Sequence, residues 1–161
     1  MNKPDIIILM GSKADLEFAQ KVADAAIQFG LTPVLHVASA HKTALHLIKI
    51  LDDYESDPSA KVYITIAGRS NALSGFVDGY VKTPVIACPP ASTAYGGADI
   101  YSSLRMPSGI APAVVLEPEN AALLAAKILS HVNKNCLQKV QAYKAAQMQK
   151  IIEADAEVNG K

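Results

Sequence analysis

The sequence predicts an α/β fold, a single-domain, three-layer, doubly wound parallel sheet of about five strands with a C-terminal helical extension. Its 161 residues suit one domain with one hydrophobic core. Half of the residues are apolar and only 6% are aromatic, so the core is mainly aliphatic, as in parallel strands buried beneath helices. Short apolar runs also alternate along the chain with segments of helical periodicity.

The first strand and the first helix have the clearest signals. Residues 5–10 carry an apolar run that ends at Gly11, as in a central parallel strand buried on both faces. The next segment has apolar residues at helical spacing, with Asp15 available as its cap and Gly30 at its end. By the same criteria we expect strands at 5–10, 33–38, 61–67, 84–88 and 113–116, and helices at 16–29, 43–51, 73–79, 99–105 and 117–131.

This alternation of strands and helices predicts right-handed crossovers and a flavodoxin-like sheet within residues 1–133. From Lys134 the composition changes to Lys, Gln and Ala, with apolar residues spaced for one helix face. We therefore expect a separate helical extension at 134–161. Its apolar stripe packs either on its own domain or on a neighbouring subunit, and the sequence leaves both alternatives open.

Charge and cysteine content exclude several classes of partner. Fifteen basic residues balance fifteen acidic ones, so no net field attracts the chain to nucleic acid or to an anionic membrane. The first apolar run is too short for a secretion signal or a membrane span, and we expect a cytoplasmic protein. Cys88 and Cys136 have no zinc-site spacing, so we expect two reduced thiols and no metal.

Ligands of open parallel sheets bind beyond the carboxyl ends of the strands, so the loops that follow strands are the candidate site. The loop after the first strand begins at Gly11 and leads into a helix. Its backbone amides and the Ser12 hydroxyl suit a phosphate, and Asp15 suits a sugar hydroxyl. The alternative is structural, with Gly11 in a tight turn and Asp15 as a helix cap.

The loop after the second strand places His41 directly before Lys42. Histidine exchanges a proton near neutral pH, and an adjacent cation suits an anionic substrate. Ser39 and Thr43 are available to cap the following helix. The alternative for His41 is an exposed loop histidine without a chemical role.

The loop after the third strand offers donors for a carboxylate or a carbonyl oxygen, since Gly68 precedes Arg69, Ser70 and Asn71. A surface arginine followed by a capping serine is the structural alternative. Cys88 follows the fourth strand and is a possible nucleophile, although the sequence shows no base beside it.

Five ordered motifs carry a resemblance to a known family. They are Met10–Asp15 (MGSKAD), Ser39–Lys42 (SAHK), Ala67–Leu73 (AGRSNAL), Cys88–Pro90 (CPP) and Ser102–Gly109 (SSLRMPSG). In this order they resemble the aminoimidazole ribonucleotide carboxylase/mutase family over about residues 5–131. Lys42 after the histidine, the Gly-Arg-Ser-Asn run and the Cys-Pro-Pro turn are most similar to the carbon-dioxide-using (class II) branch, because the mutase branch typically reads Ser-Ala-His-Arg.

The resemblance implies an enzyme of purine biosynthesis that adds carbon dioxide to aminoimidazole ribonucleotide without ATP, biotin or another cofactor. The alternatives are the mutase of the N5-carboxylated nucleotide and, from another class, a flavodoxin-like binding module without chemistry. The family also implies a homo-octamer whose sites are completed by neighbouring subunits. From the change in composition at Lys134, we expect residues 1–133 to be the α/β catalytic domain.

The resemblance also implies roles for individual residues. His41 handles protons, Asp15 holds the ribose, and Ala14 stands where the family usually has a serine, which removes one phosphate donor. The other implied contacts are with the phosphate (Gly11, Ser12 and Lys42), with the ring (Ser39 and Ala40) and with carbon dioxide or the new carboxylate (Gly68, Arg69, Ser70 and Asn71).

Overall fold

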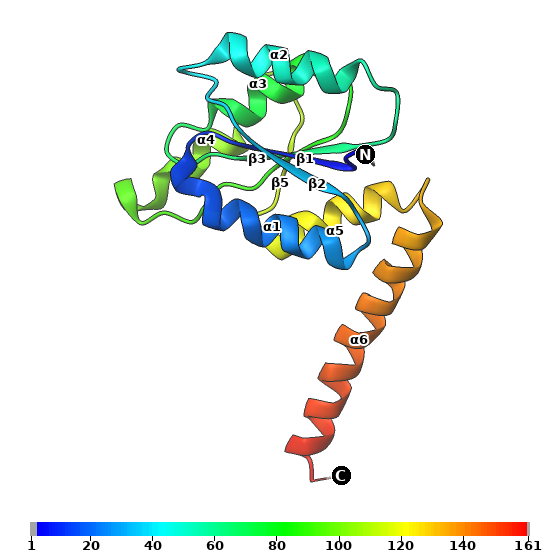
Figure 1. Ribbon diagram of the computed structural model, residues 1–161. Helices are drawn as coiled ribbons and strands as arrows, with labels where there is room; N and C mark the ends of the chain where they lie inside the picture. The colour runs from blue at the N-terminus through cyan, green and yellow to red at the C-terminus, as the bar shows by residue number, and fades with distance from the viewer. Residues whose placement is uncertain (1–2, 161) are drawn as a thin grey trace.

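The computed structural model describes residues 3–160, which form a five-stranded parallel sheet with helices on both faces (Figure 1). The strand order β2-β1-β3-β4-β5 is that of flavodoxin-like folds, so the predicted fold class is confirmed. The strands are β1 (Ile6–Met10), β2 (Pro33–Val37), β3 (Val62–Ile66), β4 (Val85–Ala87) and β5 (Ala113–Val114). The helices are α1 (Leu16–Gln28), α2 (Ala44–Glu55), α3 (Ala72–Tyr80), α4 (Tyr101–Leu104), α5 (Pro118–Leu129) and α6 (Lys134–Val158), with short 3-10 helices η1 (Lys13–Asp15) and η2 (Ala94–Ile100).

Strand β1 lies between two apolar layers, one on each face of the sheet, which explains its unbroken apolar sequence. Side chains alternate between the faces of a strand, so Ile6 and Ile8 pack on the α1 and α5 side, whereas Ile7 and Leu9 pack on the α2 and α3 side. Figure 1 shows these two helix pairs on opposite faces of the sheet. All five residues of β1 are buried, so a polar side chain has no place in this strand.

Two predicted elements differ from the observed ones. The helix expected at 99–105 is instead η2 followed by the single turn of α4. Tyr95, Gly96 and Gly97 have left-handed backbone, with φ of 54°, 63° and 77°, which interrupts a regular helix. The strand expected at 113–116 has only two residues in β5, although the Val115 amide still donates to the Ala87 carbonyl.

Helix α6 packs on its own domain only through its first turns. Asn133 caps it by accepting from the Cys136 amide at 3.0 Å, and the Cys136 and Val140 side chains are buried in the α1 and α5 layer. The Tyr143 ring meets the Phe29 ring edge-on, with centroids 5.4 Å apart. Beyond Tyr143 the helix extends away from the sheet (Figure 1).

The outer turns of α6 leave an apolar stripe in solvent. Met148, Ile151 and Ile152 are 65%, 73% and 60% exposed. The first turns of the extension therefore pack on their own domain, as one of the two alternatives expected, whereas these three side chains of its outer turns remain exposed. No helix within residues 3–160 has the length and hydropathy that a membrane span requires.

Candidate functional site

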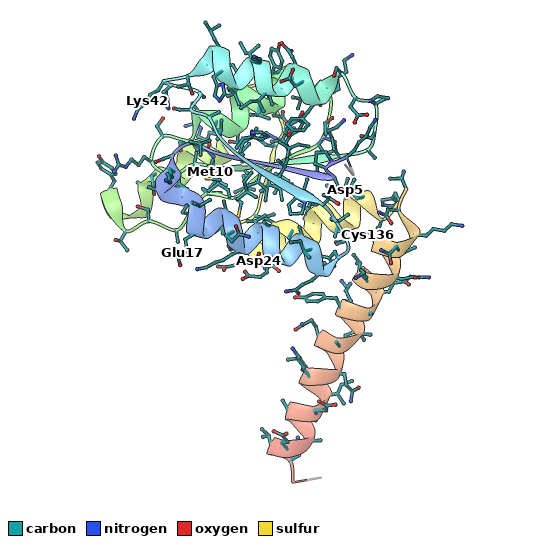
Figure 2. All side chains as sticks on the ribbon, viewed as in Figure 1. Asp5, Met10, Glu17, Asp24, Lys42 and Cys136 are labelled. Atoms are coloured by element: carbon teal, nitrogen blue, oxygen red, sulfur yellow. The ribbon has the colours of Figure 1, made fainter. Side chains whose placement is uncertain are left out.

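The three predicted loops meet at one edge of the sheet. Strand β1 pairs in parallel with β2 and β3, so the loops that follow these three strands are neighbours. Figure 2 shows Met10, at the end of β1, and Lys42 at this edge, with Asp5 at the opposite edge. The loops enclose a cavity of about 500 Å³, lined by Gly11, Ser12, Ala14, Asp15, Ser39, Ala40, His41, Lys42, Ala67, Gly68, Arg69, Ser70 and Leu73.

In the first loop, Ser12 rather than Asp15 acts as a helix cap. The Ser12 hydroxyl accepts from the Ala14 amide at 3.1 Å and begins η1. Asp15 occupies the position before α1 but makes no capping bond with its side chain, so the expected cap is wrong. Burial raises the pKa of the Asp15 carboxyl, and the Ser12 backbone amide partly offsets this rise. The carboxylate is therefore available to a ligand, while the Ser12 hydroxyl proton still has a free direction in which to donate.

In the second loop, Ser39 and Thr43 bond to each other instead of capping α2. The Thr43 hydroxyl accepts from the Ser39 amide at 2.9 Å and lies 3.3 Å from the Ser39 carbonyl, and it makes no capping bond to the helix. The Ser39 hydroxyl accepts from the Lys42 amide at 3.3 Å. This closed loop presents the His41 and Lys42 side chains on the cavity lining, and both are exposed.

The third loop turns sharply at Arg69, whose φ of 57° lies in the left-handed region. Arg69 and Ser70 line the cavity, but Asn71 does not, because its side chain is turned into the protein and is only 4% exposed. Asn71 accepts from the Ser74 amide at 3.2 Å and so caps α3, and it donates to the Ser103 hydroxyl at 2.9 Å. Asn71 thus supports the loop from behind, whereas the sequence suggested a contact with the ligand.

The residues that hold this loop are the part of the site that sequence reasoning missed. Asp99 accepts from the Arg69 amide at 3.3 Å, and Ser102 accepts from the Asn71 amide at 2.9 Å. Both serines, Ser102 and Ser103, lie in the Ser102–Gly109 motif. The Ser102–Gly109 motif therefore indicated residues that support the site, although nothing in the sequence showed which loop they contact.

A second, smaller cavity of about 230 Å³ lies beside the first and shares Ala67, Gly68 and Arg69 with it. The Gly68–Arg69 segment therefore forms part of the wall between the two cavities. The remaining lining is mostly apolar and consists of Pro89, Pro90, Ala91, Ser92, Gly97, Asp99, Ile100, Ser103 and Leu116.

The Cys88 thiol is unsuited to nucleophilic catalysis. It is fully buried, and burial together with the Glu117 and Glu119 charges raises its pKa to about 12. Its Sγ lies 3.8 Å from the Leu116 carbonyl oxygen. The thiol is therefore protonated at neutral pH and is not the nucleophile considered from the sequence. Within residues 3–160, no three His, Cys, Asp or Glu side chains are grouped to hold a metal ion.

Comparisons with known proteins agree with this architecture. The family model described as AIR carboxylase matches residues 5–150. A phosphoribosylaminoimidazole carboxylase of Treponema denticola is 56% identical over 97% of this chain and 98% of its own length. A protein of the same name from Archaeoglobus fulgidus is 48% identical over 94% of this chain and 83% of its own length.

A larger bifunctional protein and a solved structure also resemble this chain. The human bifunctional phosphoribosylaminoimidazole carboxylase/phosphoribosylaminoimidazole succinocarboxamide synthetase is 39% identical over 85% of this chain, which corresponds to 32% of its own length. The crystal structure of Treponema denticola PurE superposes with a TM-score of 0.94 and covers 96% of this chain and 98% of that one. The family match extends over most of this sequence, and the fold and the strand-end cavity agree with it. The chain therefore belongs to the AIR carboxylase family and is an enzyme of purine biosynthesis.

Proposed function

We propose that this chain joins carbon dioxide to C4 of 5-aminoimidazole ribonucleotide and forms 4-carboxy-5-aminoimidazole ribonucleotide, without ATP or a cofactor. One observation carries the proposal. Groups suited to a phosphate, to a sugar, to proton transfer and to a carboxylate all line one cavity of about 500 Å³, a size suited to a small-molecule ligand. The carboxylase names of the Treponema and Archaeoglobus relatives support the same reaction.

The nucleotide would be held by the first two loops. The Gly11 and Ser12 loop and the Lys42 ammonium suit the phosphate, because they combine hydrogen-bond donors with a positive charge. Asp15 makes no capping bond and is available to accept from a ribose hydroxyl. Ser39 and Ala40 line the same cavity and would contact the ring.

The chemical step follows from the electron-rich ring. The C4 electron pair forms a bond with the carbon of carbon dioxide, and one C–O electron pair moves to oxygen as the carboxylate develops. The adduct carries both hydrogen and carboxylate on C4. A His41 imidazole nitrogen then takes that hydrogen as a proton, and the C–H electron pair restores the aromatic ring. Gly68, Arg69 and Ser70 would border the carbon dioxide and the carboxylate, which suits the donors of this loop.

Replacing His41 tests the proton-transfer step. In H41N we expect kcat to fall by about 10²- to 10⁴-fold, the usual contribution of a positioned general base. Nucleotide affinity measured by calorimetry should stay close to that of the unchanged protein, because the phosphate and ribose contacts remain. His131 is also exposed but does not line the cavity, so H131N is the matched control and should retain full turnover. Normal turnover of H41N would remove His41 from the mechanism.

The mutase of N5-carboxyaminoimidazole ribonucleotide is the second candidate, because the same cavity and family match suit it equally. Supplying aminoimidazole ribonucleotide and bicarbonate without ATP separates the two activities. We expect the carboxylated nucleotide to form from this mixture. Product from the N5-carboxylated nucleotide alone would instead establish the mutase.

We also propose that the chain works as a homo-octamer in the cytoplasm, with the outer turns of α6, beyond Tyr143, docking on a neighbouring subunit. The exposed apolar stripe of α6 supports this arrangement, because Met148, Ile151 and Ile152 require burial that residues 3–133 do not supply. Cys88 and Cys136 are both free and buried, and this absence of a disulfide between them agrees with a reducing cytoplasm.

A further inference from the structure

The cavity wall contains a residue in a conformation that its surroundings must maintain. Arg69 and Tyr95 are the non-glycine residues with positive φ in the described chain, and Arg69 lies on the wall of the candidate site. A side chain in the left-handed region is disfavoured by contact between its Cβ and the backbone. Such a residue persists at a functional site only where neighbouring bonds hold it.

The Ser102 hydroxyl supplies bonds on both sides of Ser70, the residue that follows Arg69. Its Oγ accepts from the Asn71 amide at 2.9 Å and lies 3.1 Å from the Arg69 carbonyl oxygen and 2.7 Å from the Asp99 carbonyl oxygen. A hydroxyl has one proton and two acceptor positions, so Ser102 accepts from Asn71 while its proton is shared between the two carbonyls. One side chain thus contacts both peptide groups that flank Ser70.

Two further hydrogen bonds join the third loop to Asp99 and Ser103, on either side of Ser102. The Asp99 carboxylate accepts from the Arg69 amide at 3.3 Å, and the Ser103 hydroxyl accepts from the Asn71 side chain at 2.9 Å. Ser103 and Asn71 are 2% and 4% exposed, so water cannot readily replace a lost partner there. The α4 region thus holds the loop that separates the two cavities.

We propose that Ser102 is a positioning residue for the reaction, because it fixes the 68–70 backbone at the wall nearest the developing carboxylate. This inference rests on the proposed carboxylation. The phosphate and the ribose would be held by the first two loops, whereas the bonds of Ser102 go to the third. Movement of the third loop therefore affects the reacting carbon and leaves nucleotide binding intact.

The test compares S102A, S102T and a matched control, S130A. Ser130 donates to the carbonyl of the third residue before it, Lys127, at 2.7 Å, as Ser102 does to Asp99, but it lies at the end of α5 away from the cavity. We expect S102A to lower kcat by about 10-fold or more, since small misplacements of reacting groups are costly. Nucleotide affinity should stay within about threefold, S102T should recover most of kcat, and S130A should match the unchanged protein.

Several outcomes would overturn the inference. These are an unchanged kcat in S102A, an equal loss in S130A, a loss of nucleotide affinity at constant kcat, or a folded S102T as slow as S102A. Amide hydrogen exchange of residues 68–72 gives a second readout that does not depend on activity. We expect it to accelerate in S102A and not in S130A, and unchanged exchange would also overturn the inference.

This second readout separates the two proposals. If the unchanged protein forms no product from aminoimidazole ribonucleotide and bicarbonate, the proposed function fails, and the exchange measurement alone decides whether Ser102 holds the loop. If the unchanged protein is active and S102A is equally active, the function stands and the role of Ser102 is rejected.

Discussion

Asp15 occupies a position where its ionised side chain lowers the stability of the folded protein. It lies at the start of α1, where a carboxylate commonly caps the helix, but its side chain makes no capping bond. Burial raises the pKa of this carboxyl, so the folded state favours its protonated form. Because the raised pKa lies above the value of 3.8 in the unfolded chain, the ionised group lowers stability once the pH rises through the folded-state pKa.

Replacing Asp15 by Asn should therefore raise stability and weaken function. At pH 7 we expect D15N to have a higher melting temperature than the unchanged protein, and the difference should vanish as the pH falls below 3.8. Nucleotide affinity should fall by about 10- to 100-fold through loss of a charge-assisted hydrogen bond to the ribose. Thermal unfolding at several pH values and calorimetry of nucleotide binding measure both effects.

Asp24 offers the control for this prediction, because it is exposed on the same helix and does not line the cavity. D24N should bind nucleotide normally and show no comparable gain in stability. A D15N protein that binds nucleotide as tightly as the unchanged protein would exclude Asp15 from the ribose contact.

At the scale of elements, the end of α1 and the start of α6 depend on one glycine. Gly30 follows α1 with a φ of 75°, a conformation that other residues rarely adopt. A Cβ at this position would lie 2.9 Å from Asn135 Nδ2 and 3.1 Å from Lys139 Cε. These two side chains belong to α6, and Lys139 also donates to the Gln28 carbonyl at 3.4 Å. The turn thus joins the domain to its C-terminal helix.

Replacing Gly30 by Ala should destabilise the fold by about 1–2 kcal/mol, mainly through left-handed backbone strain, because the α6 side chains can move aside. Denaturant unfolding measures this change in the free energy of unfolding. A methyl group added to Gly68 would meet no atom within 4 Å, and Gly68 has no positive φ, so G68A is the control and should unfold like the unchanged protein. Equal stability of G30A and the unchanged protein would show that the turn tolerates a side chain.

At the scale of the whole molecule, the proposed association of the chain depends on the outer half of α6. Ile151 and Ile152 are 73% and 60% exposed, and burying each at a subunit interface would contribute about 1.5–3 kcal/mol. We therefore expect the I151D/I152D double variant to sediment as smaller species than the unchanged protein, which should form a stable oligomer. Sedimentation velocity at working concentration measures this directly.

A control of equal charge change is available on the same helix. Ala146 and Lys150 lie on the opposite face by helical spacing, and A146D/K150Q alters the net charge by the same amount as I151D/I152D. This control should keep the oligomer. A stable monomer of the unchanged protein at working concentration would contradict both the proposed octamer and the docking of the outer turns of α6.

Local sequence determined the elements and the edge of the sheet that carries the site. The apolar run at 5–10 requires burial on both faces, and parallel strands place their following loops at one edge, so Ser12, His41 and Arg69 could be grouped without a structure. The helix expected at 99–105 was less accurate, because its first residues belong to the 3-10 helix η2, which begins before the left-handed turn at Tyr95–Gly97 and has no α-helical periodicity.

Only the tertiary structure decided how the third loop is held. Asn71 turns inward, and its partners Ser102 and Ser103 lie 31 and 32 residues further along the chain. Local spacing reports which residues share a helix face or a strand face, but it carries no information about which distant hydroxyl meets which amide. The left-handed Arg69 and its support from α4 arise only when the packed elements bring those groups within hydrogen-bonding distance.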